Sequence, residues 1–236
     1  MTLRSWYPSI VTRVSCFSQE TYYSFSHGKD FVALTFIRLK IFKIYASKTM
    51  DKGILHLQKM KPIKRGLVII YHGNGKGKTT AAIGMLIRAL GHGYKVAYLQ
   101  FLKNSVSGET KFLSKISEVL FYQGGAGFVG IMGDKKSFDE HRKKAKETLK
   151  FASKILQEGT YYIVVLDEIN CALSLGLLEL EEVLQAINSR KENVNVVLTG
   201  CVAPDKLIEI ADIVTEMVKV KHIYDQGYLA KIGVDF

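Results

Sequence analysis

From residue 66 onward, short apolar runs alternate with longer stretches in which apolar residues recur at helical spacing. The runs at 67–71 and 163–166 are continuously apolar, which is typical of strands buried on both faces of a parallel sheet. Six strands are expected, at 67–71, 95–101, 119–122, 161–166, 195–199 and 213–220. Helices are expected between them, at 78–90, 138–157, 180–189 and 204–211. The alternation predicts an α/β fold in which helices cover both faces of a mostly parallel sheet.

Residues 1–60 show no such alternation. They are rich in Ser, Tyr and Phe, poor in acidic residues, and have no capped amphipathic helix pattern. We therefore expect a single domain at 61–236, preceded by an atypical basic and aromatic N-terminal extension at 1–60. Two interpretations of the extension stay open. It is either a genuine segment, for example a transit-like targeting sequence, or translated non-coding sequence upstream of a natural start at Met50 or Met60.

The net charge does not point to a nucleic-acid partner. Thirty-three Lys and Arg residues against 22 Asp and Glu give a formal charge of +11. Nine of the basic and three of the acidic residues lie in the extension, which leaves 24 against 19, or +5, for the domain. That modest excess suits a solvated basic face or a protein that handles a triphosphate. Since no aromatic RNA-binding motif accompanies it, no nucleic-acid partner is expected.

Composition also bears on the compartment. With 47% hydrophobic residues, 23% charged residues and 3 prolines, the chain can bury a core and is not a disordered protein. The most apolar stretch, 31–46, is interrupted by Arg38, Lys40 and Lys43, so no membrane span is expected. The 3 cysteines form no CxxC pair, which predicts neither a disulfide framework nor a zinc ribbon and favours the cytoplasm.

The most specific motif is a glycine-rich segment between the first expected strand and the first expected helix. It reads Gly73, Asn74, Gly75, Lys76, Gly77, Lys78, Thr79 and Thr80. Glycines let successive backbone N–H groups face one anion, and the helix start adds the positive end of its dipole. Lys78 is expected to contact phosphate oxygens, and the hydroxyl of Thr79 or Thr80 to bind Mg²⁺. The motif makes the expected sheet one of the P-loop NTPase type, RecA-like in arrangement.

The spacing within this loop is unusual. The standard P-loop places four residues between its first glycine and the Gly-Lys pair, whereas only three residues separate Gly73 from Gly77. Because the loop is one residue shorter than that of a kinase or GTPase, transfer of the γ-phosphoryl group does not follow from the motif alone.

Two acidic residues follow the strand expected at 161–166. Asp167 and Glu168 would lie at the carboxyl edge of the sheet, where a carboxylate can hold Mg²⁺ or Mn²⁺ directly or through water. An acidic pair in this position is often only the N-cap of a helix. The glycine-rich loop upstream favours the metal-binding interpretation.

Further motifs, in chain order, go beyond a generic P-loop. They are RALGHG at 88–93, QFLK at 100–103, VLDE at 165–168, LTG at 198–200, ADIVTEM at 211–217 and KHIYDQG at 221–227. With GNGKGKTT they resemble the ATP:corrinoid adenosyltransferases over residues 66–236. The resemblance implies transfer of the 5′-deoxyadenosyl group of ATP to the Co(I) of a reduced corrinoid, with release of triphosphate. The physiological setting would be biosynthesis or salvage of adenosylcobalamin.

The resemblance also implies roles for individual residues. The loop at 73–80 would bind the triphosphate, and Arg88 would lie near the nucleotide. Lys78 and Glu168 would be catalytic, with Thr79, Asp167 and Glu168 at the metal. Phe128, in the segment 127–130, would face the corrinoid.

The sequence departs from the family pattern at two positions, and the family implies partners. Gly130 stands where better-known members have Trp, and Cys201 stands where many have Arg; we assign no role to Cys201. The implied partners are ATP, a corrinoid and a flavodoxin-type reductant. The implied oligomer is a homodimer in which an N-terminal segment closes over the nucleotide.

Two other functions remain open at this point. One is a P-loop ATPase or kinase that cleaves at the γ-phosphate and releases ADP. The other is a regulator without catalytic activity, in which ATP switches a basic surface that binds nucleic acid or a protein partner.

Overall fold

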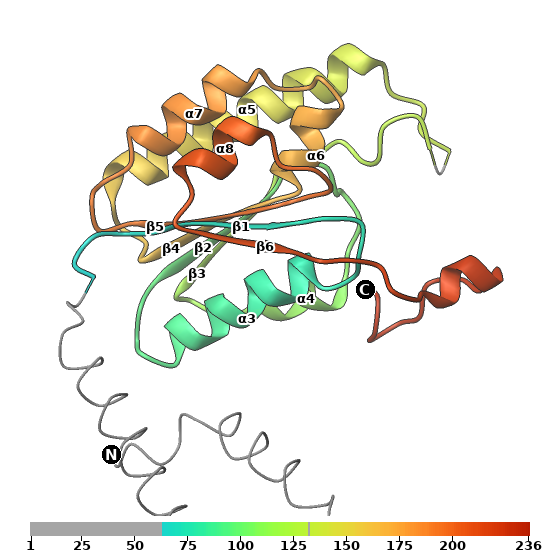
Figure 1. Cartoon of the computed structure of the whole chain (residues 1–236), viewed down its shortest axis with the longest axis horizontal. Coiled ribbons are helices and arrows are strands. Elements are labelled where there is room, and N and C mark those ends of the chain that lie inside the picture. Colours follow the sequence, from blue (N-terminus) through green and yellow to red (C-terminus); the bar gives the residue numbers. More distant parts are fainter. Residues whose placement is uncertain (1–62, 132) are drawn as a thin grey trace, which may run out of the picture. The chain divides into compact units, whose positions relative to one another are not determined.

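The structure is a computed structural model that describes residues 63–131 and 133–236, so the expectations for 1–60 lie outside it. Within the described residues, six strands form one parallel sheet in the order β3-β2-β4-β5-β1-β6 (Figure 1). The strands are β1 (Val68–His72), β2 (Val96–Gln100), β3 (Val119–Gln123), β4 (Ile163–Asp167), β5 (Asn195–Thr199) and β6 (Ile213–Glu216). The predicted parallel sheet is confirmed, with strand bounds shifted by at most two residues except at the end of β6.

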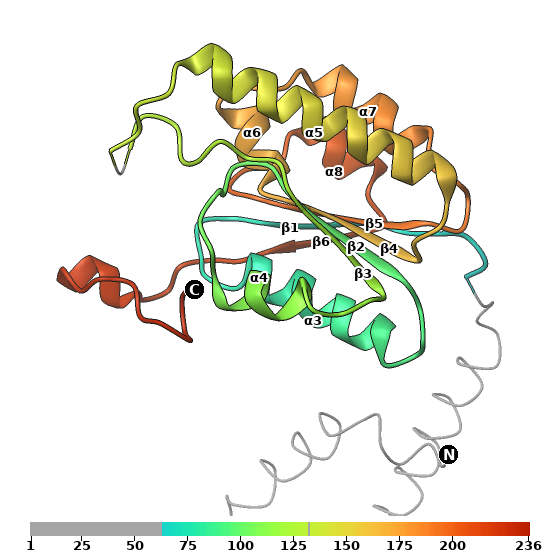
Figure 2. The ribbon, with the colours of Figure 1, turned by 180° about the vertical axis from the view of Figure 1, so that it is seen from behind.

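Helices lie on both faces of the sheet, as predicted. They are α3 (Lys78–Leu90), α4 (Gly108–Leu113), α5 (Phe138–Glu158), α6 (Ile169–Ser174), α7 (Leu180–Asn188), α8 (Asp205–Ile210) and the 3₁₀ helix η2 (Ile223–Gln226). Helices α3 and α4 cover one face, and α5 to α8 cover the other (Figures 1 and 2). Helices α4 and α6 were not predicted; each has only six residues, whereas the equally short α8 was expected within a longer segment at 204–211.

Each face of the sheet has its own apolar core. Leu86 of α3 packs with Ile69 and Tyr98 on one side, and Leu149 and Leu156 of α5 belong to the larger cluster on the other. This two-sided burial explains the continuously apolar strands, since neither face of β4 or β5 meets water.

The carboxyl edge of the sheet gathers the chemically interesting segments. All six strands are parallel, so the loops after them emerge on one side. The turn from β1 to α3, the long loop from β3 to α5 and the C-terminal arm after β6 all lie there (Figures 1 and 2).

Strand β6 ends at Glu216, four residues before the predicted end at 220. The N–H of Met217 still donates to the carbonyl of His72 at 2.7 Å, but the Met217 carbonyl accepts from Gly75 in the glycine-rich loop at 2.6 Å. Strand β6 ends here because the next backbone hydrogen bond is made with the glycine-rich loop and no longer with β1.

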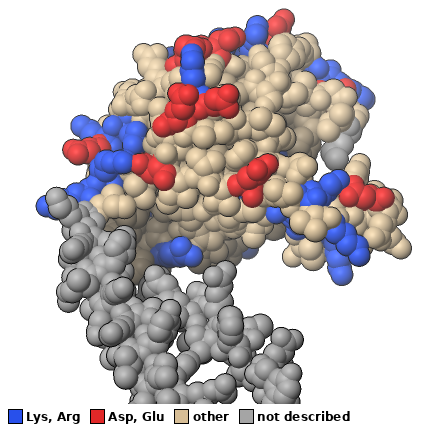
Figure 3. All heavy atoms as spheres, in the orientation of Figure 1, with Lys and Arg blue, Asp and Glu red and all other residues tan. Residues whose placement is uncertain are grey.

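Charges of both signs are interspersed on the described surface seen in Figure 3. On α5, Lys144 pairs with Glu147 and Lys146 pairs with Glu182 of α7, at 3.0 and 3.2 Å. This side of the domain is therefore a mixed, solvated face. Within the described residues, no helix has the length and apolar character that a membrane span requires.

Candidate nucleotide-binding site

The glycine-rich loop at 73–80 curls tightly between β1 and α3. Gly73 and Gly77 adopt φ angles of +111° and +119°, a backbone conformation that favours glycine. The Lys78 Nζ donates to the carbonyls of Gly73 and Gly75 at 2.9 and 2.8 Å, so its ammonium lies against the inner side of the curl. No side chain caps the start of α3, so its first N–H groups are left for an anion.

The C-terminal part of the chain holds this loop in place. The N–H of Gly73 donates to the Cys201 carbonyl, and the N–H of Gly75 donates to the Met217 carbonyl, both at 2.6 Å. A Cβ built on Gly73 would lie 2.4 Å from the Met217 oxygen, too close for any side chain. The glycines are therefore needed for this close approach as well as for the curl.

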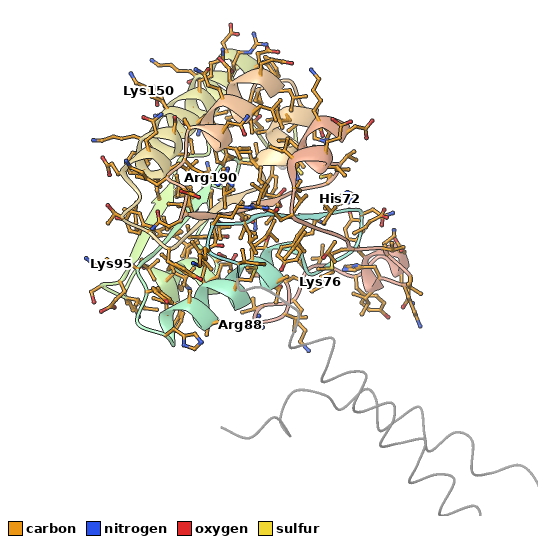
Figure 4. The ribbon with its side chains drawn as sticks, turned by 60° about the vertical axis from the view of Figure 1, so that its left-hand side comes forward. His72, Lys76, Arg88, Lys95, Lys150 and Arg190 are labelled. Carbon is orange, nitrogen blue, oxygen red and sulfur yellow. The ribbon has the colours of Figure 1, made fainter. Side chains whose placement is uncertain are left out.

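Two loop side chains predicted to bind ATP contact the segment after β6 in the structure. The Asn74 Oδ1 accepts from the N–H of Lys219 at 2.9 Å. The Lys76 Nζ donates to Asp235 at 2.6 Å and is exposed (Figure 4). Both contacts link the loop to the segment after β6, whereas Lys78 is the loop lysine whose ammonium lies inside the curl.

Asp167 is fully buried at the end of β4 and collects three hydroxyl donors. Its Oδ1 accepts from Thr79 at 3.0 Å and from Thr199 at 2.8 Å, and its Oδ2 accepts from Tyr98 at 2.8 Å. The ammonium of Lys103 lies 3.9 Å from Oδ2. Burial, together with the Asp167 charge, raises the pKa of Tyr98, which keeps the phenol protonated as a donor.

Glu168 has a strained backbone. Its φ of 64° is the only positive value at a non-glycine residue within the described segments. Its N–H donates to the Thr199 hydroxyl at 2.9 Å, which helps hold the residue in place at the start of α6. Strain of this kind costs about 1–3 kcal/mol and often marks functional sites.

The structure brings together only part of the predicted set. The Thr79 hydroxyl donates to Asp167, whereas Thr80 is exposed on α3, so Thr79 is the threonine that lies beside the acidic residue. Arg88 lies in the last turn of α3, ten residues and about 15 Å along the helix from Lys78 (Figure 4). It lines a pocket of about 280 Å³ with Leu67 and Ile163, at the opposite edge of the sheet from the glycine-rich loop. Arg88 therefore lies far from Lys78 within this chain, and its place near the nucleotide stays a prediction.

Phe128 lies half-buried in the loop between β3 and α5. That loop is at the carboxyl edge, but β3 is an edge strand separated from β1 by three others. Backbone N–H groups of Gly130 and Lys136 donate to Asp134 at 2.9 and 3.1 Å, and the ring of the buried His141 lies 2.9 Å from it. These backbone hydrogen bonds lower the pKa of Asp134 to about 2, so its carboxylate fixes the loop that carries Phe128.

Sequence reasoning missed most of the partners of Asp167. Thr199 and Lys103 appeared only within motifs of the family resemblance, although both lie at or just past the end of a strand, which is a usable signal. Tyr98 gave no signal, because an aromatic residue in the middle of a buried strand looks the same as a core residue.

The thiol of Cys171 also lies beside this site. It is buried, and burial together with the neighbouring Glu168 carboxylate raises its pKa. Its sulfur accepts a hydrogen bond from the N–H of Cys201 at 3.0 Å.

The loop geometry and its buried aspartate place the chain among the P-loop nucleotide-binding proteins. Comparison with known proteins is more specific. Residues 64–236 match the family described as ATP:corrinoid adenosyltransferase BtuR/CobO/CobP, and the chain belongs to this family. The resemblance noted in the sequence is thereby confirmed.

Several relatives carry the same description. The corrinoid adenosyltransferase of Pseudomonas aeruginosa is 42% identical over 175 residues, which cover 73% of this chain and 85% of the relative. Those of Escherichia coli K12 and Salmonella typhimurium are 36% and 33% identical over 173 residues, 73% of this chain and 87% of each relative.

Proposed function

We propose that this protein transfers the 5′-deoxyadenosyl group of ATP to the Co(I) centre of a reduced corrinoid and releases triphosphate, in biosynthesis or salvage of adenosylcobalamin. The observation that carries the proposal is the family match over residues 64–236, with the short P-loop at its start. The Pseudomonas and Escherichia relatives named for this activity support it.

In this reaction the substrate cobalt is the nucleophile. Its electron pair forms the bond to C5′ of the ribose as the bond from C5′ to the triphosphate oxygen breaks. The triphosphate leaves with that bonding pair. No serine, cysteine or histidine base is required, so the protein acts by positioning and by stabilising charge on the leaving group.

The loop at 73–80 supplies that stabilisation. The N–H groups of Gly73 and Gly75 already donate to the Cys201 and Met217 carbonyls, so the N–H groups at the uncapped start of α3 face the triphosphate, and Lys78 adds a full positive charge. In the structure the Lys78 ammonium is held by the carbonyls of Gly73 and Gly75, and phosphate oxygens replace these acceptors on binding. A short, glycine-rich curl suits a reaction in which all three phosphates depart together.

The donor set beside the loop fits Mg²⁺ or Mn²⁺. The Thr79 hydroxyl and the Asp167 carboxylate are 3.0 Å apart, and hard cations prefer oxygen ligands of this kind. Thr79 would hold the ion directly and Asp167 through water, because three hydroxyls already surround the aspartate. Glu168 offers a second carboxylate on the less buried side. A bound divalent ion neutralises charge on the triphosphate.

Phe128 is the residue we assign to the corrinoid. It belongs to a loop at the carboxyl edge that is fixed by Asp134 and by a hydrogen bond from Lys136 Nζ to the Ala126 carbonyl at 2.6 Å. Gly130, where relatives have Trp, leaves Phe128 as the aromatic side chain of this segment.

The family assignment supports three further proposals about the setting. The protein would act as a homodimer in the cytoplasm, and a flavodoxin-type protein would supply the electron that yields Co(I). Light scattering in solution tests the dimer, and replacing a chemical reductant with reduced flavodoxin tests the donor.

An anaerobic assay tests the proposed reaction. Reduced cobalamin is mixed with ATP, Mg²⁺ and the full chain, and the corrinoid spectrum is followed while the nucleotide products are separated. Formation of the Co–carbon product together with triphosphate is expected. ADP and phosphate without a change in the corrinoid would favour a γ-phosphate-cleaving ATPase instead.

A further inference from the structure

Two cysteines and a glutamate converge beside the glycine-rich loop. Glu168 precedes α6, Cys171 lies in its first turn, and Cys201 follows β5 by two residues. The neighbouring strands β4 and β5 bring these segments together. A carboxylate oxygen of Glu168 and the two thiol sulfurs all lie within 4.8 Å of one another. Across residues 63–131 and 133–236, no other group of three such side chains is this compact.

The backbone around the two thiols is fixed. The Cys201 N–H donates to the Cys171 sulfur at 3.0 Å, and the Cys201 carbonyl accepts from Gly73 at 2.6 Å. Cys171 is 6% exposed, whereas Cys201 is exposed. The pair therefore has one sulfur anchored in the interior and one on the solvent side, where an ion can enter.

The separations suit a tetrahedral centre. Zinc binds thiolate sulfur at about 2.3 Å, which puts two sulfur ligands of one ion about 3.8 Å apart. Separations of up to 4.8 Å reach this value by a shift of about 1 Å, within the range of side-chain rotation. Two sulfurs and one carboxylate leave a fourth position for water. Sulfur ligands select zinc-like cations over Mg²⁺, which takes oxygen ligands in octahedral geometry.

We propose that Glu168, Cys171 and Cys201 form a binding site for a thiophilic divalent cation of the Zn²⁺ type. Binding exchanges the two thiol protons for the ion. The site does not depend on the proposed transferase activity, although it shares Glu168 with the Mg²⁺ position suggested above. A bound thiophilic ion would thus draw that carboxylate away from the triphosphate.

Metal titration of the full chain tests this site without any activity measurement. The protein, kept reduced by a phosphine, is titrated with Zn²⁺ against a chromogenic chelator, and separately with Co²⁺ in the absence of corrinoid. We expect one Zn²⁺ per chain and a sulfur-to-cobalt charge-transfer band in the Co²⁺ spectrum. Cys201→Ala and Cys171→Ala should each weaken Zn²⁺ binding by more than about 100-fold, since loss of even an outer-shell partner costs 10- to 100-fold.

The third cysteine provides the matched control. Cys16 belongs to the extension at 1–60, and the Cys16→Ser variant should bind Zn²⁺ with the same affinity as the unchanged chain. The exposed Cys201 makes Cys201→Ala the decisive variant, because the buried Cys171→Ala change also affects packing. Unchanged Zn²⁺ affinity in Cys201→Ala, a Co²⁺ spectrum without the sulfur band, or loss of binding in Cys16→Ser would each overturn the proposal.

Discussion

The Lys78 ammonium has no acidic partner in the structure's described part; it is held by two loop carbonyls. A cation that is bound only by neutral acceptors is readily transferred to a phosphate, which carries full charge. Under the proposed function, we therefore assign to Lys78 the main share of charge stabilisation on the leaving triphosphate.

We expect Lys78→Ala to lower kcat by about 10²–10³-fold, the loss seen when one preorganised donor to a developing anion is removed. Rates of Co–carbon bond formation measure this directly. Lys95→Ala removes an exposed lysine just before β2 and serves as the control. Equal rates for the two variants would contradict the assignment of the phosphate loop.

Asp167 shows how a buried charge is held at this site. Tyr98→Phe removes the hydroxyl that donates to Oδ2 of the fully buried Asp167. Hydrogen bonds to charged groups contribute about 1.5–3 kcal/mol. We expect Tyr98→Phe to lower the free energy of unfolding by that amount in urea titrations.

Tyr94→Phe is the matched control for this change. The Tyr94 ring is 44% exposed and stacks on Tyr162, so loss of its hydroxyl should alter stability by no more than about 0.5 kcal/mol. If the two variants were equally stable, the buried hydrogen-bond network would not matter for folding.

At the scale of elements, the glycine-rich loop and the segment after β6 form one unit. Gly73→Ala places a methyl group 2.4 Å from the Met217 carbonyl at a φ of +111°. We expect it to destabilise the fold by more than about 1–2 kcal/mol, the cost of the backbone conformation alone. Thermal unfolding measures the effect.

For Gly84, inside α3, we expect the opposite effect on stability when it is replaced by alanine. A Cβ on Gly84 meets nothing within 4 Å, so Gly84→Ala should stabilise the protein by about 0.5–1 kcal/mol through helix propensity. Destabilisation by Gly84→Ala, or none by Gly73→Ala, would contradict the packing described here.

The loop between β3 and α5 should respond to acid through Asp134. Folding lowers the pKa of this carboxyl from 3.8 to about 2. The stability it contributes is therefore present above about pH 4 and lost as the pH falls through about 2. In urea titrations at a series of pH values, Asp134→Asn should be less stable than the unchanged chain near neutral pH. The gap should close in acid, whereas a gap independent of pH would contradict this account.

At the scale of the whole molecule, the described residues and the family match cover nearly the same stretch. Two apolar clusters and a six-stranded sheet lie within the described residues, and the family match begins at residue 64. We expect a chain that starts at Met60 to unfold in a single cooperative urea transition. A chain from Met60 without a cooperative transition would show that the extension is required for folding.

The strand pattern of this domain was predictable because buried parallel strands form continuous apolar runs, as 67–71 and 163–166 do. The phosphate loop and Asp167 were also predictable, since their chemistry requires particular residue types at the ends of strands. The hydroxyls around Asp167 were not, because they depend on the strand order that places β2 and β5 on either side of β4. The place of Arg88 was also predictable, because the expected helix at 78–90 already puts it in the last turn.

The bond between Lys76 and Asp235 has a practical consequence. Asp235 lies 19 residues after the end of β6, so the arm that leaves the sheet turns back and reaches the glycine-rich loop. A bulky group attached next to Asp235 would crowd this loop, and Asp235→Ala would free Lys76 while leaving the sheet intact.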